Sequence, residues 1–368
     1  MIIMKKIIFI LSVFLSVTAF AQVTTSKIQG VVSEGNAPLF GASVVAKHNP
    51  TGTVSGTMTQ ENGNYSITNL RVGGPYTVTI SYVGFKTVEY SDIYLELGKT
   101  TDLNAVLASE SEELEEVVIQ ISRDNTFNTG RTGSETSIGS RELTSLPTIS
   151  RSQADFTRLE PSASGGSFGG RNDQYNNFSL NGTIFNNPFG LDAATPGGQT
   201  DAQPISLDAI DQIQVSTAPY DVSQSGFTGA AVNAVTKSGT NEWDGTVYGY
   251  FRNDAMTGNK IDGDEIFVPS LSHYQAGFSL GGPIKKDKIF FFINAERENR
   301  SDAGSDWVPQ NADNVGNSNT ASVLESDMIA VQQALANLGY DTGAYTGYKH
   351  ITESWKGIVK LDFNINDK

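Results

Sequence analysis

The first residue in the chain that could do chemistry is a serine among glycines. Gly165-Gly166-Ser167-Phe168-Gly169 has the spacing of a nucleophile elbow, in which a strand, a sharp turn and a helix expose a serine for acyl transfer. That reaction also needs histidine and acid partners. Here Pro161-Ser162-Ala163-Ser164 precedes the motif and no helical pattern follows it. We therefore predict no catalytic residue and no enzyme.

Metal and thiol chemistry have little support. The chain has no cysteine, which removes disulfides, thiolate ligands and thiol nucleophiles. It has only three histidines, at positions 48, 273 and 350, too few for a multi-histidine centre. Asp262-Gly263-Asp264-Glu265 is an acidic cluster of the type that Ca²⁺ favours, but its spacing does not fit an EF-hand loop. We interpret it as a solvated loop and expect no metal and no cofactor.

Composition narrows the class of protein. The 368 residues include 25 Lys and Arg against 40 Asp and Glu, so the formal net charge is −15. An acidic chain lacks the basic face that a nucleic acid requires, so no nucleic-acid partner is expected. The 38% hydrophobic content is too high for a fully disordered chain, and 37 glycines favour turns and β-structure. The length suggests two or three domains.

Residues 1–21 have the pattern of a secretory signal peptide. Lys5 and Lys6 precede a short apolar run, and Ala19-Phe20-Ala21 supplies a cleavage site before Gln22. The alternative is a membrane anchor, although the run is short of the roughly 20 residues that span a bilayer. No later stretch of 18 apolar residues occurs, so membrane insertion downstream would have to use β-strands.

Residues 22–107 alternate short β-runs with turns, which predicts a small β-sandwich. The expected strands are 27–32, 41–46, 65–67 and 76–82. Residues 108–120 then form an acidic linker that ends in the apolar triplet Val117-Val118-Ile119. A short strand after a flexible leader can add to the sheet edge of a partner. It can equally be the first strand of the next domain.

Residues 121–240 have a mixed α+β pattern. We expect helical turns at 141–146 and 152–159, a short helix from 205 that enters a strand at 213–215, and a strand at 231–236. Arg141 to Leu146 must end before Pro147, because the residue before proline avoids the helical region. A stretch rich in Gly and Asn, 165–187, lies between these elements.

Residues 241–368 change to long alternating strands, expected at 243–252, 273–280, 289–297 and 353–365. In the last strand Val359, Leu361 and Phe363 face opposite to Lys360 and Asp362. A tight turn at 283–288 contrasts with long connections at 253–272 and 301–351, the second with a helical pattern at 322–338. These features favour the first strands of an outer-membrane β-barrel over a soluble antiparallel sheet, which stays an alternative.

The N-terminal pattern resembles a carboxypeptidase regulatory-like domain. The resemblance is carried by 28–32 (IQGVV), 38–44 (PLFGASV), 62–65 (NGNY), 76–78 (YTV) and 84–85 (GF). It implies an immunoglobulin-like sandwich without catalytic residues, located in the periplasm. Glycan binding and a spacer or docking role both remain open for it.

The middle pattern resembles the plug domain of a TonB-dependent outer-membrane receptor. The resemblance is carried by 146–151 (LPTISR), 170–172 (GRN), 178–182 (FSLNG), 205–215 and 226–240 (GFTGAAVNAVTKSGT). The segments 218–222 (APYDV) and 250–253 (YFRN) are similar to the Oar-like subgroup, and the SusC-like subgroup is less similar. Family barrels have 22 strands, so the four expected here form an incomplete barrel and imply C-terminal truncation.

The resemblance implies TonB-dependent active transport across the outer membrane of a Gram-negative bacterium. The middle domain would plug the barrel, and TonB, driven by ExbB and ExbD, would pull on a TonB box. This box is similar to Leu114, Glu115, Glu116, Val117, Val118 and Ile119. The other implied partners are outer-membrane lipid, an imported substrate (glycan, peptide or siderophore) and a surface lipoprotein. The alternative is an adhesion or structural β-protein of the outer membrane that transports nothing.

The resemblance also points to a candidate substrate site, since plug apices contact substrate in the family. The residues are those of the Gly/Asn stretch: Arg171, Asn172, Asn176, Asn177 and Asn186. Their amides and guanidinium could bind a polar, glycan-like or anionic ligand. Alternatively, Arg171 pairs with barrel carboxylates and seats the plug.

Overall fold

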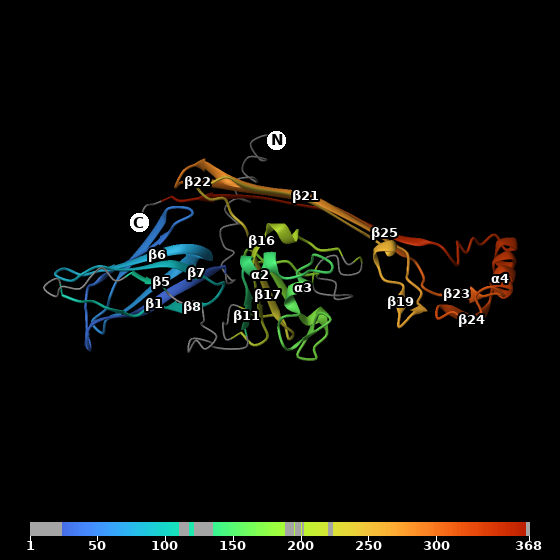
Figure 1. Ribbon diagram of the computed structural model, residues 1–368, viewed down its shortest axis with the longest axis horizontal. Helices are drawn as coiled ribbons and strands as arrows, with labels where there is room; N and C mark the ends of the chain where they lie inside the picture. Colours follow the sequence, from blue (N-terminus) through green and yellow to red (C-terminus); the bar gives the residue numbers. More distant parts are fainter. Residues whose placement is uncertain are drawn as a thin grey trace, which may run out of the picture. The chain divides into compact units, whose positions relative to one another are not determined.

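The structure is a computed structural model, described here over residues 24–109, 118–120, 135–187, 195, 200, 202–219 and 224–365 (Figure 1). Strands predominate in it, which confirms the expected mainly β fold. The chain divides into two compact units, of which the second comprises Thr246–Phe278 and Ala295–Gly357. Among the helices that these residues form, none has both the length and the apolar character needed to cross a membrane. The signal peptide expected at 1–21 lies outside the described residues.

The first sheet of the N-terminal sandwich is built on β1 (Thr25–Glu34). β2 (Ala37–Pro38) and β5 (Asn64–Arg71) pair with it antiparallel, and β8 (Thr100–Asp102) and β9 (Ala105–Val106) pair with it in parallel. Only glycine fits at Gly30, because a Cβ there would lie 1.9 Å from the carbonyl oxygen of Leu103. The close approach lets the segment after β8 pack directly on β1.

The second sheet has the order β10-β7-β6-β3-β4. β3 (Ser43–His48), β4 (Thr53–Met58), β6 (Gly73–Ser81) and β7 (Val88–Leu95) are antiparallel neighbours. β10 (Val118–Gln120) extends the edge by pairing in parallel with β7, so that Val118 lies opposite Glu89 and Gln120 opposite Ser91. Sequence patterning did not anticipate β4, β7, β8 or β9.

The sandwich core is apolar, and its tyrosines are tied to the backbone. Alternate residues of β1, β3, β5, β6 and β7 point between the sheets, as their period of two requires. Tyr65 donates a hydrogen bond to the Leu103 carbonyl oxygen (2.8 Å), Tyr76 to Arg71 (2.8 Å) and Tyr90 to Asn104 (2.7 Å). Each buried hydroxyl therefore has an acceptor. The largest fully buried side chains of this core are Ile28, Ile80, Leu95 and Leu107.

A third five-stranded sheet forms the middle domain, by which we mean the described residues 135–236. Its order is β11-β16-β17-β14-β15, built from β11 (Glu135–Ile138), β14 (Asn177–Leu180), β15 (Thr183–Ile184), β16 (Ile210–Ser216) and β17 (Ala231–Thr236). Only the β14–β17 pair is parallel. Its apolar cluster includes Phe156, Phe178, Ile213 and Val215.

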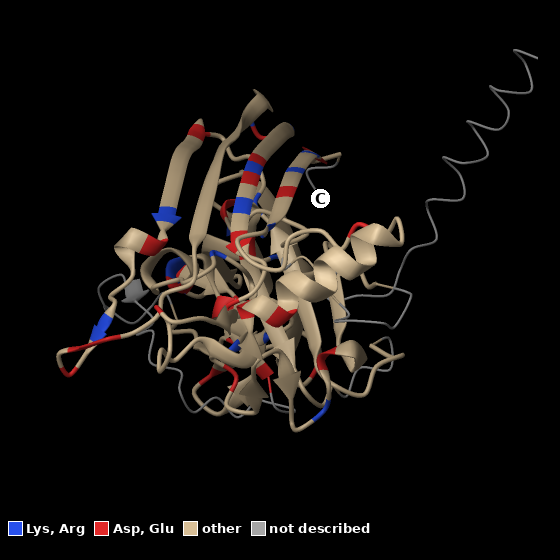
Figure 2. Ribbon diagram, turned by 90° about the vertical axis from the view of Figure 1, so that its right-hand side faces the viewer, with Lys and Arg blue, Asp and Glu red and all other residues tan. Residues whose placement is uncertain are grey.

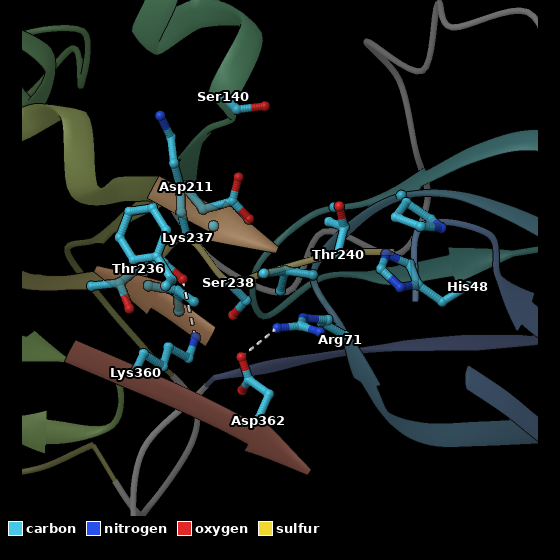
Figure 3. A pocket seen from close by; sticks show the side chains of 18 of the residues that line it. His48, Arg71, Ser140, Asp211, Thr236, Lys237, Ser238, Thr240, Lys360 and Asp362 are labelled. Carbon is cyan, nitrogen blue, oxygen red and sulfur yellow. Dashed lines mark hydrogen bonds and ion pairs between the residues drawn. The ribbon is translucent and has the colours of Figure 1, made fainter. Parts of the chain in front are cut away.

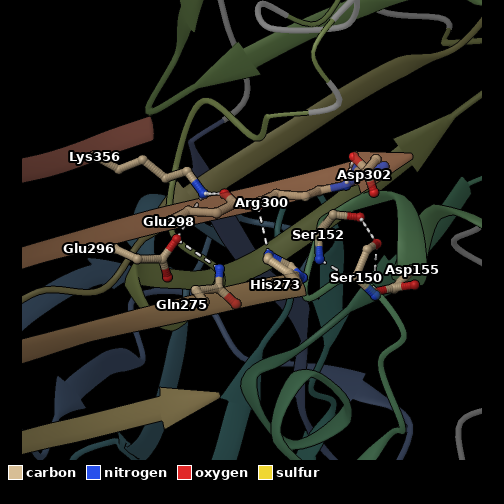
Figure 4. Close-up of polar contacts among 10 residues, drawn as sticks. All are labelled: Ser150, Ser152, Asp155, His273, Gln275, Glu296, Glu298, Arg300, Asp302 and Lys356. Carbon is tan, nitrogen blue, oxygen red and sulfur yellow. Dashed lines mark hydrogen bonds and ion pairs between the residues drawn. The ribbon is translucent and has the colours of Figure 1, made fainter. Parts of the chain in front are cut away.

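Short helices flank this sheet where the sequence predicted them. α2 (Ser140–Ser145) ends at the extended residue Leu146 before Pro147, and the Glu142 side chain accepts from the Gly139 backbone N–H (3.0 Å). α3 (Ala154–Thr157) follows, and the Asp155 carboxylate accepts from the Ser150 backbone N–H at 3.0 Å (Figure 4). The helix expected from 205 is a single 3₁₀ turn, η4 (Leu207–Ala209), and β16 begins at Ile210, three residues earlier than expected.

Other short elements complete the middle domain. β12 (Ala163–Ser164) and β13 (Ser167–Phe168) pair as a hairpin, and η2 (Asp173–Tyr175) precedes β14. Sequence reasoning had left this Gly/Asn-rich stretch without elements, because segments of two or three residues carry no periodicity.

The last region is a four-stranded sheet of order β18-β21-β22-β25. Its strands are β18 (Asp244–Asn253), β21 (Leu271–Lys285), β22 (Ile289–Ala303) and β25 (Lys349–Phe363). β21 continues three residues into the turn expected at 283–288. The long connections hold η5 (Asp254–Met256), β19 (Lys260–Ile261), β20 (Asp264–Glu265), β23 (Val308–Gln310), β24 (Thr320–Leu324) and α4 (Glu325–Asn337).

These long strands expose many apolar residues and bury several polar ones, although Phe290 and Phe292 of β22 are also buried. In β25, Val359, Leu361 and Phe363 are exposed, whereas Lys356 is buried and Lys360 half-buried, which confirms the expected alternation. In β22, Asn294, Glu296 and Glu298 are buried. Figure 2 shows acidic and basic residues as short separate bands on the ribbon. A sheet with this polarity suits lipid on one side and a polar interior on the other.

Candidate functional site

The predicted TonB-contact segment lies mostly outside the described residues. The described residues do not include Leu114, Glu115, Glu116 and Val117. The backbone of Val118 and Ile119 belongs to β10. β10 joins the sandwich sheet instead of beginning the middle domain, which was the alternative for this strand. Val118 and Ile119 therefore have backbone geometry suited to strand addition, and the contact of the segment with TonB stays a prediction.

The candidate substrate residues have two kinds of environment. Asn177 is buried and its Oδ1 accepts from Asn186 Nδ2 (2.9 Å), while Asn186 Oδ1 accepts from the Phe178 backbone N–H (2.7 Å). Asn176 donates to the Gly166 carbonyl (2.8 Å) and accepts from the Ala230 N–H (3.0 Å). These three amides hold neighbouring segments together.

Arg171 and Asn172 are exposed on the same stretch. Asn172 accepts from the Gln174 backbone N–H (2.9 Å) and thereby begins η2, with its amide nitrogen free of any described contact. No partner of the Arg171 side chain is found among the described residues. Of the five candidates, these two are the ones that could offer donors to a ligand.

The two motifs set aside at the sequence level adopt simple local structures. Ser167 begins β13 of the β12–β13 hairpin and is followed by no α-helix, unlike the serine of a nucleophile elbow. Asp262, Asp264 and Glu265 form the exposed β19–β20 hairpin, where Glu265 pairs with Lys260 (3.7 Å). Within the described ranges, no group of three or more His, Asp or Glu side chains could hold a metal ion.

A polar cavity that sequence reasoning missed lies in the first unit. Its volume is about 740 Å³, and segments from the sandwich, the middle domain and the end of β25 line it (Figure 3). Arg71 Nη2 pairs with Asp362 Oδ2 at 3.1 Å, and Lys360 Nζ donates to the Thr236 carbonyl at 3.2 Å. The charged residues of the lining are Arg71, Asp211, Lys237, Glu242, Asp244, Lys360 and Asp362.

The charges of the cavity are close to balanced. Lys237 Nζ lies 3.7 Å from Asp208 Oδ1. The positive charge of Lys237 is therefore partly neutralised by a carboxylate that is not part of the lining. Burial raises the pKa of Asp211 above its ordinary value, and the cations Lys237 and Arg71 act in the opposite direction. This arrangement binds segments of the chain to one another through polar contacts.

The second unit holds a buried charge cluster in the four-stranded sheet (Figure 4). Lys356 Nζ lies 2.8 Å from Glu296 Oε1 and 2.7 Å from Glu298 Oε2, and all three side chains are buried. Gln275 donates to Glu296 Oε1 (2.9 Å) and Tyr248 to Glu296 Oε2 (2.5 Å), while His273 Nε2 lies 3.0 Å from Glu298 Oε1. Each of the three buried charges therefore has a partner within the cluster.

Some of these features left traces in the sequence. Asn294 and Glu296 alternate with the apolar residues Ile293 and Ala295 in a strand, which is the signal of a polar interior face. Gln212 and Gln214 interrupt the apolar run of β16 in the same way. Their partners were not predictable, because contacts such as Gln212 with Leu97 join residues 115 positions apart.

Comparison with known proteins agrees with this architecture. Residues 27–108 match a carboxypeptidase regulatory-like domain, and residues 235–368 match an outer membrane beta barrel domain. The chain is 30% identical to the TonB-dependent transporter Oar of Myxococcus xanthus over 247 residues, which covers 64% of this chain and 23% of Oar. It is 31% identical to the TonB-dependent receptor P3 of Formosa agariphila over 154 residues, 41% of this chain and 14% of that receptor.

Among solved structures, the outer membrane transporter YddB of Escherichia coli has a TM-score of 0.41 and 15% identity, covering 64% of this chain and 31% of YddB. The chain spans less than a quarter of the length of each of the two curated relatives, Oar and P3. The two domain matches and the two curated relatives confirm the resemblance seen in the sequence. The chain is an outer-membrane protein that is similar to the TonB-dependent transporter Oar and the TonB-dependent receptor P3 and contains a carboxypeptidase regulatory-like domain on its N-terminal side.

Proposed function

We propose that this chain serves TonB-dependent active transport of a substrate across the outer membrane, with the middle domain as a gated plug. The observation that carries the proposal is the four-stranded sheet, which buries Glu296, Glu298 and Lys356 and exposes Val359 and Leu361. Such a wall needs lipid outside and a filled or wet interior. In this proposal the chain consists of a sandwich (22–107), a coupling linker (108–120), a plug (121–240) and a barrel wall (241–368).

The mechanism follows from the need to open a filled pore. A wide barrel leaks unless something occupies it, and the outer membrane has no nucleotide or ion gradient to move that occupant. The work is supplied by ExbB and ExbD of the inner membrane through TonB. The middle domain has its own sheet, and its apolar cluster also includes Phe292 of β22, so a shift or partial unfolding of this domain would have to release that contact with the barrel sheet.

The handle for TonB is the segment Leu114–Ile119. β10 already pairs as a strand with β7, which supports the idea that this segment binds partners by backbone hydrogen bonds. TonB would add to the same short strand in place of β7 or along its other edge.

The substrate is a polar or anionic molecule that contacts Arg171 and Asn172. Both are exposed, and neither the Arg171 guanidinium nor the Asn172 amide nitrogen has a described partner. Asn176, Asn177 and Asn186 support this surface from beneath by their internal hydrogen bonds.

TonB binding tests the proposal directly. The receptor, expressed from its native gene and purified from outer membranes, is titrated with the periplasmic domain of TonB. We expect Val118→Pro to weaken binding at least tenfold with unchanged outer-membrane assembly, because proline removes a backbone donor from the strand. Val118→Thr is the matched control, since it keeps the donor and the β-branched shape.

Two outcomes would count against the proposal. Equal TonB binding by Val118→Pro and the parent would place the handle elsewhere. A parent that does not bind TonB at all would favour the adhesion or structural role.

A further inference from the structure

A buried glutamine joins the sandwich to the middle domain. Gln212 of β16 donates from Nε2 to the Leu95 carbonyl oxygen (3.0 Å) and accepts at Oε1 from the Leu97 backbone N–H (2.8 Å). Its carboxamide therefore forms hydrogen bonds with the backbone at the end of β7, as a neighbouring strand would. Beside it, Val72 and Leu97 of the sandwich pack with Val235 of β17 in a small apolar cluster.

A second set of contacts joins the sandwich to the end of the four-stranded sheet. Arg71, at the end of β5, pairs with Asp362 of β25 at 3.1 Å, and both side chains are half-buried. Near the β3–β4 turn, Asn364 Nδ2 donates to Thr53 Oγ1 (2.9 Å), and the Asn241 backbone N–H donates to the Pro50 carbonyl oxygen (2.8 Å). All of these residues belong to the first compact unit.

These contacts surround space and do not fill it. The 740 Å³ cavity lies among them, lined by Arg71, Asp211 and Asp362 (Figure 3). Among the described residues, the buried apolar cluster of this contact consists of Val72, Leu97 and Val235, and the contacts named above are polar. Interfaces of this kind within one chain resemble those of partners that separate, in contrast to a continuous hydrophobic core.

We propose that the sandwich is a releasable latch, which holds the middle domain against the barrel wall until it undocks. It binds the middle domain through Gln212 and the wall through Arg71, so the middle domain cannot leave the wall while both contacts hold. The inference rests on the proposed gated plug and adds the sandwich as its lock. β7 also pairs with β10 at residues 89–91, close to the Leu95 contact, so a pull on the leader acts on the strand that carries the latch.

The test measures opening without TonB or substrate. The receptor, purified from outer membranes, is placed in a planar lipid bilayer, and KCl conductance is recorded as urea is raised on the periplasmic side. We expect Gln212→Ala to conduct at lower urea than the parent. The matched control Gln214→Ala removes a buried glutamine of the same strand that bonds within the middle domain, to Asn233 and Glu135.

A tether provides the opposite change. The chain lacks cysteine, so an Arg71→Cys, Asp362→Cys pair can be bridged by a short bis-methanethiosulfonate reagent at two half-buried positions. We expect the bridged receptor to need more urea than the parent, and reductant to return the threshold to that of the unbridged pair.

Three outcomes would overturn the latch. The first is a bridged receptor that opens at the same urea as the reduced one. The second is an equal effect of Gln214→Ala and Gln212→Ala, which would assign the shift to the stability of the middle domain alone. The third is a parent that conducts without urea, which would contradict the gated plug itself, whereas loss of TonB binding would leave this measurement unchanged.

Discussion

The sandwich buries apolar side chains, whereas the four-stranded sheet buries charged side chains and exposes apolar ones. In the sandwich, Ile28, Val78 and Ile80 are fully buried between two sheets, and its buried tyrosines donate to backbone carbonyls. In the four-stranded sheet, Lys356 and Glu296 are buried, whereas apolar residues occupy the outer face. Both regions are mainly antiparallel β-structure with period-two alternation in most strands, so strand type alone does not determine which residues are inside.

The difference teaches that the surroundings decide the pattern. Water around the sandwich favours burial of apolar surface, at about 25 cal/mol per Å². Lipid around the four-stranded sheet removes that driving force from its outer face, so polar groups collect on the inner face and must satisfy one another. Three changes test this comparison.

The largest effect is expected from breaking the buried charge cluster. Lys356→Met leaves the carboxylates of Glu296 and Glu298 without their shared cation, and removing one partner of a buried ion pair costs about 3–5 kcal/mol. Stability is measured as the temperature at which the purified receptor in detergent loses its folded mobility on SDS gels. Lys349→Met is the control, because Lys349 is exposed at the start of the same strand.

Addition of Glu298→Gln to Lys356→Met should recover part of the loss, since it removes one of the unpaired charges. A Lys356→Met receptor as heat-resistant as Lys349→Met would mean that the cluster is solvated, and the contrast with the sandwich would then fail.

The next effect is a pH dependence confined to the sandwich. His48 is buried, its Nδ1 lies 2.7 Å from Thr51 Oγ1, and burial together with the Arg71 charge lowers its pKa from 6.5 to about 4. The imidazole of His48 therefore stays neutral in the folded chain, whereas in the unfolded chain it takes up a proton near pH 6.5. Stability is complete above pH 6.5 and falls as pH decreases toward 4, by about 3 kcal/mol in all.

Amide hydrogen exchange of β3 and β6 at pH 4.5 and pH 7, corrected for intrinsic rates, measures this loss. His48→Gln has no group that titrates in this range, so it should show a flatter dependence in the same peptides. An unchanged slope in His48→Gln would assign the acid sensitivity to other groups.

The sequence predicted element type where the period was long and regular. Alternation identified β17 at its observed bounds and the apolar outer face of β25, and proline marked the end of α2. It missed β7, in which Asp92 adopts a positive φ of 58° and interrupts the alternation. β8 and β9 were missed because strands of two or three residues have no period to detect.

The site was predictable only in its local parts. Asn176, Asn177 and Asn186 were identified as polar residues of one stretch, yet whether they contact a ligand or one another depends on β14, β15 and the residue before β17, which pack together in three dimensions. The latch joins Gln212 to Leu97 and Arg71 to Asp362, pairs that are 115 and 291 positions apart. No spacing in a single sequence carries that information.

The smallest effect of the three sharpens the comparison on the outer faces. Val359 of β25 and Val83 of the sandwich are both exposed, with 70% and 93% of their surface accessible. On a water-facing surface, Val83→Arg should change stability by less than about 0.5 kcal/mol. On a lipid-facing wall, Val359→Arg should cost about 2 kcal/mol, because arginine at membrane depth is disfavoured by roughly 2–4 kcal/mol at the bilayer midplane. Both variants are compared by urea unfolding in phosphatidylcholine vesicles, and the cost of Val359→Arg should shrink in thinner bilayers. Equal, near-zero effects at both positions would mean that the apolar face of β25 meets water or protein, and the four-stranded sheet would then be no membrane wall.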